Sequence, residues 1–89
     1  MRVVFLYHPD SDQAGRVMDY AREYTRRHPE IEPEMLSLET LEGSDMAKLY
    51  AVTNYPAILA ISHDGRLQQL WQEERLPLMQ DLDAYAYAF

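Results

Sequence analysis

Pro56 and the residues that follow it constrain the fold more than any other part of the sequence. An apolar run covers residues 57–61, an Asp64-Gly65 pair comes shortly after, and a second strand-like run covers residues 66–71. Proline cannot donate to the hydrogen-bond ladder of a sheet, so it is best placed at the first residue of a strand. Asp-Gly between two such runs is a strong hairpin signal, because both residues tolerate the positive φ of a tight turn. The sequence therefore predicts a strand that begins at Pro56 and pairs with the next strand in an antiparallel hairpin.

The segment before this hairpin carries the pattern of a strand followed by a helix. Residues 3–7 are continuously apolar and rich in β-branched and aromatic side chains, which is typical of a strand buried on both faces. A helix is expected to start with Asp10 or Ser11 as its cap and to stop at His28-Pro29, because the residue before a proline is driven out of the helical region. Its apolar stripe comprises Ala14, Val17, Met18, Ala21 and Tyr24.

Three further elements complete the pattern. Residues 34–39 are expected to form a second strand, Ser44 or Asp45 to cap a short helix, and Pro77 to lie in the first turn of a last helix. The inward stripe of that last helix comprises Leu78, Leu82, Tyr85 and Phe89. A strand–helix–strand unit is parallel and a hairpin is antiparallel, so this order predicts an α/β fold with a mixed four-stranded sheet flanked by helices. Residues 1–89 are expected to form a single domain.

The composition argues against several classes of function. With 15 acidic and 8 basic residues the formal net charge is −7, which disfavours nucleic acid and anionic membranes as partners. No apolar stretch reaches the ~18 residues of a transmembrane helix. Residues 1–10 are too short and too polar for a signal peptide, which favours a cytoplasmic location. The three histidines lack the spacing of a zinc site, and no metal or cofactor is expected.

Residues 50–59 read Tyr-Ala-Val-Thr-Asn-Tyr-Pro-Ala-Ile-Leu, and Asp64-Gly65 follows them. This segment resembles the surroundings of the cis-proline in thioredoxins and protein disulfide isomerase domains. Together with the element order, it makes nearly the whole chain similar to the thioredoxin-like superfamily. The resemblance implies a β-α-β-α-β-β-α fold in which the Tyr55–Pro56 peptide bond is cis, a geometry of only about 5–6 % of X–Pro bonds in folded proteins.

The same resemblance exposes a departure from the chemistry of the superfamily. Its redox-active members carry a dithiol where the first strand ends and the first helix begins, and Ser11 and Ala14 stand at those two positions here. Disulfide exchange requires a thiolate, and the 89 residues include no cysteine. Thiol–disulfide oxidoreductase activity and one-thiol, glutathione-dependent reduction are therefore excluded for this sequence.

An alternative function is that of a small-molecule-binding protein or a non-redox enzyme that uses Asp10, Ser11 and Asp12. A serine nucleophile needs a base within reach, for which His8 and His63 are the candidates. Paired carboxylates would suit acid–base chemistry or a hard cation. Because serine and aspartate are also common at helix starts, the same three residues are explained without chemistry. We expect no catalytic residues in this chain.

The resemblance also implies a binding groove. In this fold the N-terminus of the first helix faces the loop before the cis-proline, and an extended peptide pairs with the backbone there. Carried onto this sequence, the binding residues are Ser11, Asp12, Asn54, Tyr55 and Pro56, with Tyr7 and His8 flanking the same corner. A purely structural role accounts for these residues equally well. The leading hypothesis is a redox-inactive module, monomeric or homo-oligomeric, that binds a protein or peptide. A third reading is a structural accessory domain with no groove ligand.

Overall fold

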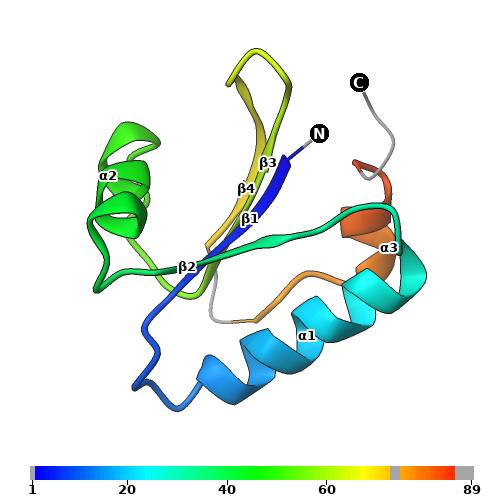
Figure 1. Ribbon diagram of the computed structural model, residues 1–89, viewed down its shortest axis with the longest axis horizontal. Helices are drawn as coiled ribbons and strands as arrows, with labels where there is room; N and C mark the ends of the chain where they lie inside the picture. Colours follow the sequence, from blue (N-terminus) through cyan, green and yellow to red (C-terminus); the bar gives the residue numbers. More distant parts are fainter. Residues whose placement is uncertain (1, 73–74, 86–89) are drawn as a thin grey trace.

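The computed structural model describes residues 2–72 and 75–85. This part of the chain contains four strands and three helices in the expected order (Figure 1). They are β1 (Arg2–Tyr7), α1 (Ala14–Arg27), β2 (Glu34–Ser37), α2 (Leu41–Leu49), β3 (Ala57–Ile61), β4 (Leu67–Trp71) and α3 (Met79–Asp83).

The strands form one mixed sheet in the order β2-β1-β3-β4. β1 and β2 are parallel and are joined by α1, whereas β3 runs antiparallel to both β1 and β4. The register pairs Leu6 with Ala57, so the end of β1 lies beside the start of β3. The predicted mixed four-stranded sheet is confirmed, with β4 at one edge.

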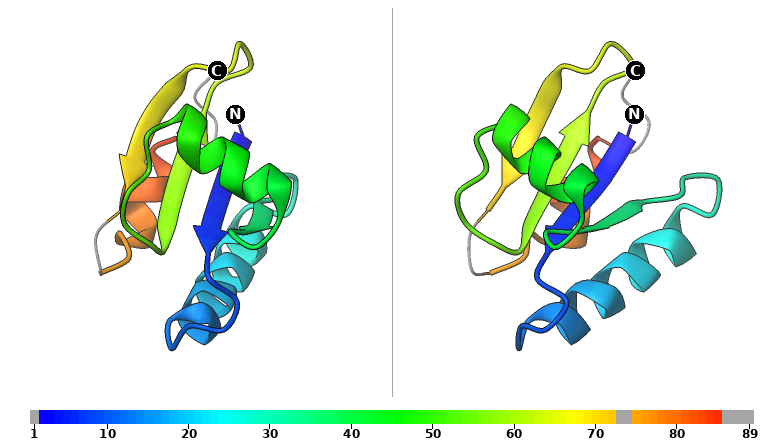
Figure 2. Two further views of the ribbon diagram at one scale, coloured as in Figure 1. Left: turned by 90° about the vertical axis from the view of Figure 1, so that its left-hand side faces the viewer. Right: turned by 60° about the vertical axis from the view of Figure 1, so that its left-hand side comes forward.

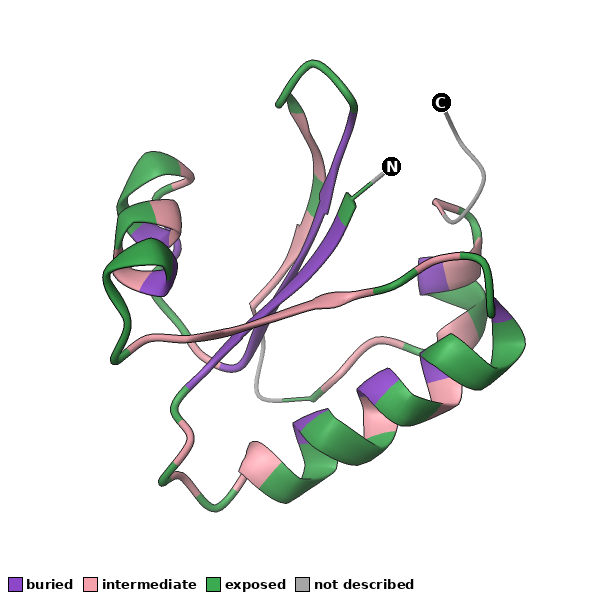
Figure 3. Cartoon of the chain, in the orientation of Figure 1, coloured by how far each residue is buried: buried purple, intermediate pink, exposed green. Residues whose placement is uncertain are grey.

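The sheet separates two apolar clusters. α1 and α3 cover one face, and α2 covers the other (Figures 1 and 2). Successive residues of a strand point to opposite faces, so β1 sends Phe5 toward Val17 and Leu82, and sends Leu6 toward Leu59 on the α2 side. The central strands β1 and β3 are buried over nearly their whole length (Figure 3). This explains why their sequences are continuously apolar.

Polar contacts join the C-terminal end of α1 to α3. Asp83 accepts hydrogen bonds from Arg27 Nη2 and from the Nε2 of the buried His28, each at 2.7 Å. His28 must be the donor in the second bond, because an ionised carboxylate can only accept. These two hydrogen bonds hold the pKa of Asp83 below its ordinary value, and the bond from Arg27 has the larger effect.

The expected cap of the first helix is wrong. α1 begins at Ala14, and no side chain in the described part of the chain caps it. Ser11 Oγ instead donates to the carbonyl oxygen of His8 at 2.7 Å, and the Ser11 N–H donates to the same oxygen at 3.1 Å. Pro9 lies at the second position of the turn thus formed, a position that proline favours. This turn uses the residues that were expected to cap the helix, so the helix starts later.

The second helix also starts elsewhere. α2 begins at Leu41, ahead of the expected Ser44 or Asp45 cap, and its cap is Thr40, whose Oγ1 accepts from the Gly43 N–H at 3.1 Å. Gly43 is buried against the backbone of Ser37 at the end of β2. The start of α2 thus depends on a contact with another element, which local sequence does not reveal.

The β3–β4 hairpin is confirmed, but its turn differs from the expected one. Gly65 has a φ of 85°, whereas Asp64 does not adopt a positive φ. The Gly65 N–H donates to Ser62 O, and the Ser62 N–H donates to Arg66 O. The Asp64 carboxylate accepts from the Ser62 hydroxyl and from the Arg66 N–H. Aspartate therefore stabilises this turn as an acceptor rather than through its backbone conformation.

The C-terminal region departs most from expectation. α3 begins after Pro77 rather than around it, and Leu82 is buried as predicted. Leu78, by contrast, is 65 % exposed, and Phe89 lies outside the described residues.

The strand expected over residues 34–39 is shorter than predicted, because β2 ends at Ser37. No helix in the described part of the chain is long and apolar enough to cross a membrane.

Candidate functional site

The loop that joins α2 to β3, residues 52–56, is referred to below as the cis-Pro loop. Its Tyr55–Pro56 peptide bond is cis, as the resemblance to thioredoxins implies. Val52 and Pro56 are buried, whereas Thr53 and Asn54 are exposed. The loop therefore presents two polar side chains to solvent between two buried anchor residues.

Gln72, which directly follows β4, forms side-chain hydrogen bonds with the backbone of the cis-Pro loop. Its Oε1 accepts from the backbone N–H of Thr53 at 2.9 Å and from that of Asn54 at 3.3 Å, and the Thr53 hydroxyl lies 3.4 Å away. One side-chain amide thus satisfies two consecutive loop N–H groups that would otherwise need water. The path of the loop is therefore coupled to the end of the edge strand.

Tyr55 and His8 meet at the end of the sheet where β1 finishes and β3 starts. Their rings lie 5.3 Å apart between centroids at an interplanar angle of 78°, an edge-to-face contact. The Tyr55 hydroxyl donates to Val52 O at 3.1 Å, within its own loop. Tyr55 is half-buried, so one part of its ring is available to a ligand while its hydroxyl is already bonded.

A cavity of about 380 Å³ lies beside this ring pair, on the side of the sheet that α2 covers. Its walls come from three segments: the residue after β1, the end of β2 with α2, and the cis-Pro loop. The lining residues are His8, Leu38, Ser44, Ala47, Lys48, Ala51, Val52, Thr53 and Tyr55. Lys48 is the only cationic side chain among them, and it forms no ion pair within the described residues.

The five residues expected to form the groove do not all contribute to this cavity. Tyr55 lines it, whereas Ser11, Asp12, Asn54 and Pro56 do not. Ser11 is half-buried with its hydroxyl bonded to His8 O, and Asp12 is exposed. Within the described residues, no hydrogen bond or ion pair joins Ser11 or Asp12 to the cis-Pro loop. The structure thus brings His8 and Tyr55 together, whereas Ser11 contacts His8 alone of this pair and Asp12 bonds to neither.

Two contributors to the site were missed by sequence reasoning. Gln72 is one of several glutamines, and only the pairing of Trp71 with Ile58 would have indicated that it lies beside the cis-Pro loop. Lys48 and the α2 wall depend on how the helix packs on the sheet, for which the sequence carries no local signal. The β1–β3 pairing, by contrast, accounts for the expected meeting of His8 with the loop.

Comparison with solved structures agrees with this geometry. Thioredoxin 1 from the thermophilic eubacterium Thermosipho africanus TCF52B superposes with a TM-score of 0.69, over 96% of this chain and 89% of that one. The chain has the thioredoxin fold. The two sequences are 8% identical, so the similarity concerns the fold alone. No protein-family model matches this sequence, and no curated protein matches it.

The thioredoxin fold here lacks the group on which disulfide exchange depends, because the sequence contains no cysteine. Ser11, at the position compared above with the attacking cysteine, donates its hydroxyl proton to a backbone carbonyl. The described residues also contain no group of three or more histidine and carboxylate side chains that could hold a metal ion.

Proposed function

We propose that this protein is a redox-inactive thioredoxin-fold module that binds a polypeptide partner at the corner formed by His8 and the cis-Pro loop. The observation that carries the proposal is the cavity beside the His8–Tyr55 ring pair, which combines aromatic surface with the exposed Thr53 and lies next to the exposed Asn54 in the chain. Ligand sites are commonly concave surfaces of this kind, with a few polar groups on an apolar lining.

The loop at this corner is organised before any partner arrives. Gln72 bonds two loop N–H groups, and the Tyr55 hydroxyl bonds Val52 O. A segment that is already ordered loses less conformational entropy on binding than a mobile one. In this proposal Asn54 and Tyr55 contact the partner, buried Pro56 directs the chain into β3, and Ser11 supports the corner through His8.

Charge indicates what kind of segment would bind. Asp10 and Asp12 are exposed, and neither forms an ion pair within the described residues. They lie in the loop between β1 and α1, which leaves the sheet next to His8. With a net charge of −7 behind them, they would favour a partner segment that carries lysine or arginine. Asp12 therefore enters the proposal as a source of attraction rather than as a direct contact.

Site-specific photo-crosslinking in cells tests the proposal. A benzophenone amino acid at position 54 should capture a defined partner, whereas the same amino acid at exposed Arg22 on α1 should not. An Asn54→Ala/Tyr55→Ala variant should then bind the purified partner about tenfold more weakly, since truncation of a central aromatic contact typically costs 1 kcal/mol or more. Circular dichroism would verify that the variant is folded. Equal capture from positions 54 and 22, or unchanged affinity of a folded double variant, would refute the proposal.

A further inference from the structure

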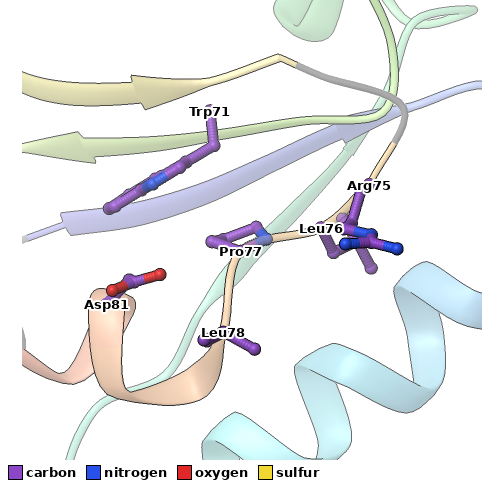
Figure 4. A pocket seen from close by; sticks show the side chains of 6 residues that line it. All are labelled: Trp71, Arg75, Leu76, Pro77, Leu78 and Asp81. Atoms are coloured by element: carbon purple, nitrogen blue, oxygen red, sulfur yellow. The ribbon is translucent and has the colours of Figure 1, made fainter.

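A second cavity, of about 330 Å³, lies on the opposite side of the sheet from the cis-Pro corner cavity. It lies between Trp71 at the end of β4, residues 75–78, and Asp81 in α3 (Figure 4). Its lining residues are Trp71, Arg75, Leu76, Pro77, Leu78 and Asp81. A smaller hollow of about 280 Å³ shares Trp71 and Asp81 with it and continues between β4 and α3 as far as Tyr85.

The floor of this cavity is aromatic and aliphatic. Trp71 is half-buried and packs edge-to-face against Tyr85, with ring centroids 5.5 Å apart. Leu78 remains 65 % exposed beside the same cavity. Trp71 and Leu78 both line the cavity and offer apolar surface to a side chain placed there.

The two ends of the cavity carry opposite charges. Figure 4 shows the Arg75 guanidinium and the Asp81 carboxylate on opposite sides of Pro77, with the Trp71 ring on the same side as Asp81. Neither forms an ion pair within the described residues, whereas Arg2, Arg22, Arg26 and Arg27 each do. The site is therefore a bipolar one, and a ligand that complements it carries an anionic group and a cationic group on either side of an apolar one.

The position of β4 indicates that the ligand is a polypeptide. β4 is an edge strand, so one side of its backbone has no neighbouring strand among residues 2–72 and 75–85. Such an edge can accept an extended peptide through main-chain hydrogen bonds while side chains enter adjacent pockets. The strand itself, Leu-Gln-Gln-Leu-Trp, carries no charge that would repel a peptide of either sign.

We propose that this surface binds an extended segment of a partner protein in which an apolar side chain is flanked by an acidic and a basic one. The apolar side chain occupies the cavity against Trp71, the acidic side chain pairs with Arg75, and the basic one pairs with Asp81. This site is independent of the proposed cis-Pro corner. A second copy of the chain is the less favoured occupant, because two molecules of net charge −7 repel each other.

Trp71 provides a direct readout, because it is the only tryptophan in the chain. The probes are two blocked pentapeptides of identical composition, acetyl-Asp-Thr-Leu-Thr-Lys-amide and acetyl-Lys-Thr-Leu-Thr-Asp-amide, each titrated into the whole protein. We expect one charge order to change the Trp71 emission saturably and the other to bind about fivefold more weakly, which corresponds to about 1 kcal/mol for exposed ion pairs. The Arg75→Asp/Asp81→Arg variant should reverse this preference.

Two leucines of similar exposure supply the matched control. Leu78→Ser should weaken binding of the preferred peptide severalfold, whereas Leu49→Ser, at a residue 74 % exposed on α2, should leave the affinity unchanged. The proposal would be overturned if neither peptide caused a saturable change in emission, or if both charge orders bound with equal affinity. A dimer seen by analytical ultracentrifugation that Leu78→Ser dissociates would also overturn it, because the surface would then serve a second copy.

Discussion

At the scale of single residues, Gly43 marks the closest approach between α2 and the end of β2. A Cβ atom at this position would lie 2.1 Å from the carbonyl oxygen of Ser37 and 2.9 Å from its carbonyl carbon. Both are backbone atoms, so α2 or β2 would have to shift. We expect Gly43→Ala to lower the free energy of unfolding by about 1–3 kcal/mol, as overpacking does, even though alanine has the higher helix propensity. Urea denaturation measures this difference.

Gly15 is the matched control, because it also lies in a helix but has no atom within 4 Å of an added Cβ. Gly15→Ala should leave the free energy of unfolding unchanged or raise it by up to about 1 kcal/mol. If both substitutions had the same effect, helix propensity rather than the contact with Ser37 would determine the outcome at Gly43.

At the scale of elements, the link between the end of β4 and the cis-Pro loop depends on Gln72. Gln72→Leu leaves the N–H groups of Thr53 and Asn54 without their acceptor, so the loop should open more often. We expect amide hydrogen exchange at these two residues to accelerate about fivefold, since a hydrogen bond contributes about 1 kcal/mol net. The amide of Leu59, in the centre of β3, should keep its protection.

Gln72→Glu is the conservative comparison for this prediction. A carboxylate of almost the same shape has two acceptor oxygens where glutamine has one, so Thr53 and Asn54 should exchange nearly as slowly as in the original protein. Fast exchange in the glutamate variant as well would mean that the loop is ordered by the packing of Tyr55 and Pro56, and that the Gln72 bonds are incidental.

Elements also differ in how far the sequence could predict them. β1 and β3 were predictable because strands buried on both faces are continuously apolar. The helix starts were not, because several residues near each start have side chains that can cap. At α1 the turn containing Pro9 uses Ser11, and at α2 the contact of Gly43 with Ser37 selects Thr40 as the cap. Each choice is made by neighbouring structure rather than by propensity.

At the scale of the whole molecule, the fold could be predicted from the sequence. The corner formed by His8 and the cis-Pro loop could be predicted only in part. The element order and the turn signals restrict the topology to few arrangements, and the sheet follows from them. His8 and Tyr55 meet because β1 and β3 are antiparallel neighbours. The Trp71 cavity and the Gln72 bonds form where the end of β4 meets other segments of the chain. Local sequence patterns do not predict contacts of this kind.

The stability of the whole molecule at alkaline pH should depend on two tyrosines between α1 and the sheet. The hydroxyls of Tyr20 and Tyr24 are buried and have no hydrogen-bond partner within the described residues. Burial, as the largest cause, raises the pKa of each from 10.0 to about 12. The unfolded chain therefore loses these protons before the folded one does. Folding stability from this source is fully present below pH 10 and is lost as the pH rises toward 12.

Tyr24→Phe tests this reasoning, because it removes an ionisable group that forms no hydrogen bond. At pH 7 the variant should be as stable as the original protein or slightly more so, since no bond is lost. Between pH 10 and pH 12 the free energy of unfolding of the variant should fall less steeply than that of the original protein. The difference in slope is about 1.4 kcal/mol per pH unit, because Tyr24 no longer ionises.

Tyr50→Phe should lower the free energy of unfolding already at pH 7, because the Tyr50 hydroxyl donates to Gly65 O at 2.7 Å and this bond is lost. Urea midpoints at pH 7 and pH 11 distinguish the two. If Tyr24→Phe costs as much as Tyr50→Phe at pH 7, the Tyr24 hydroxyl has a partner after all, and its ionisation does not limit alkaline stability.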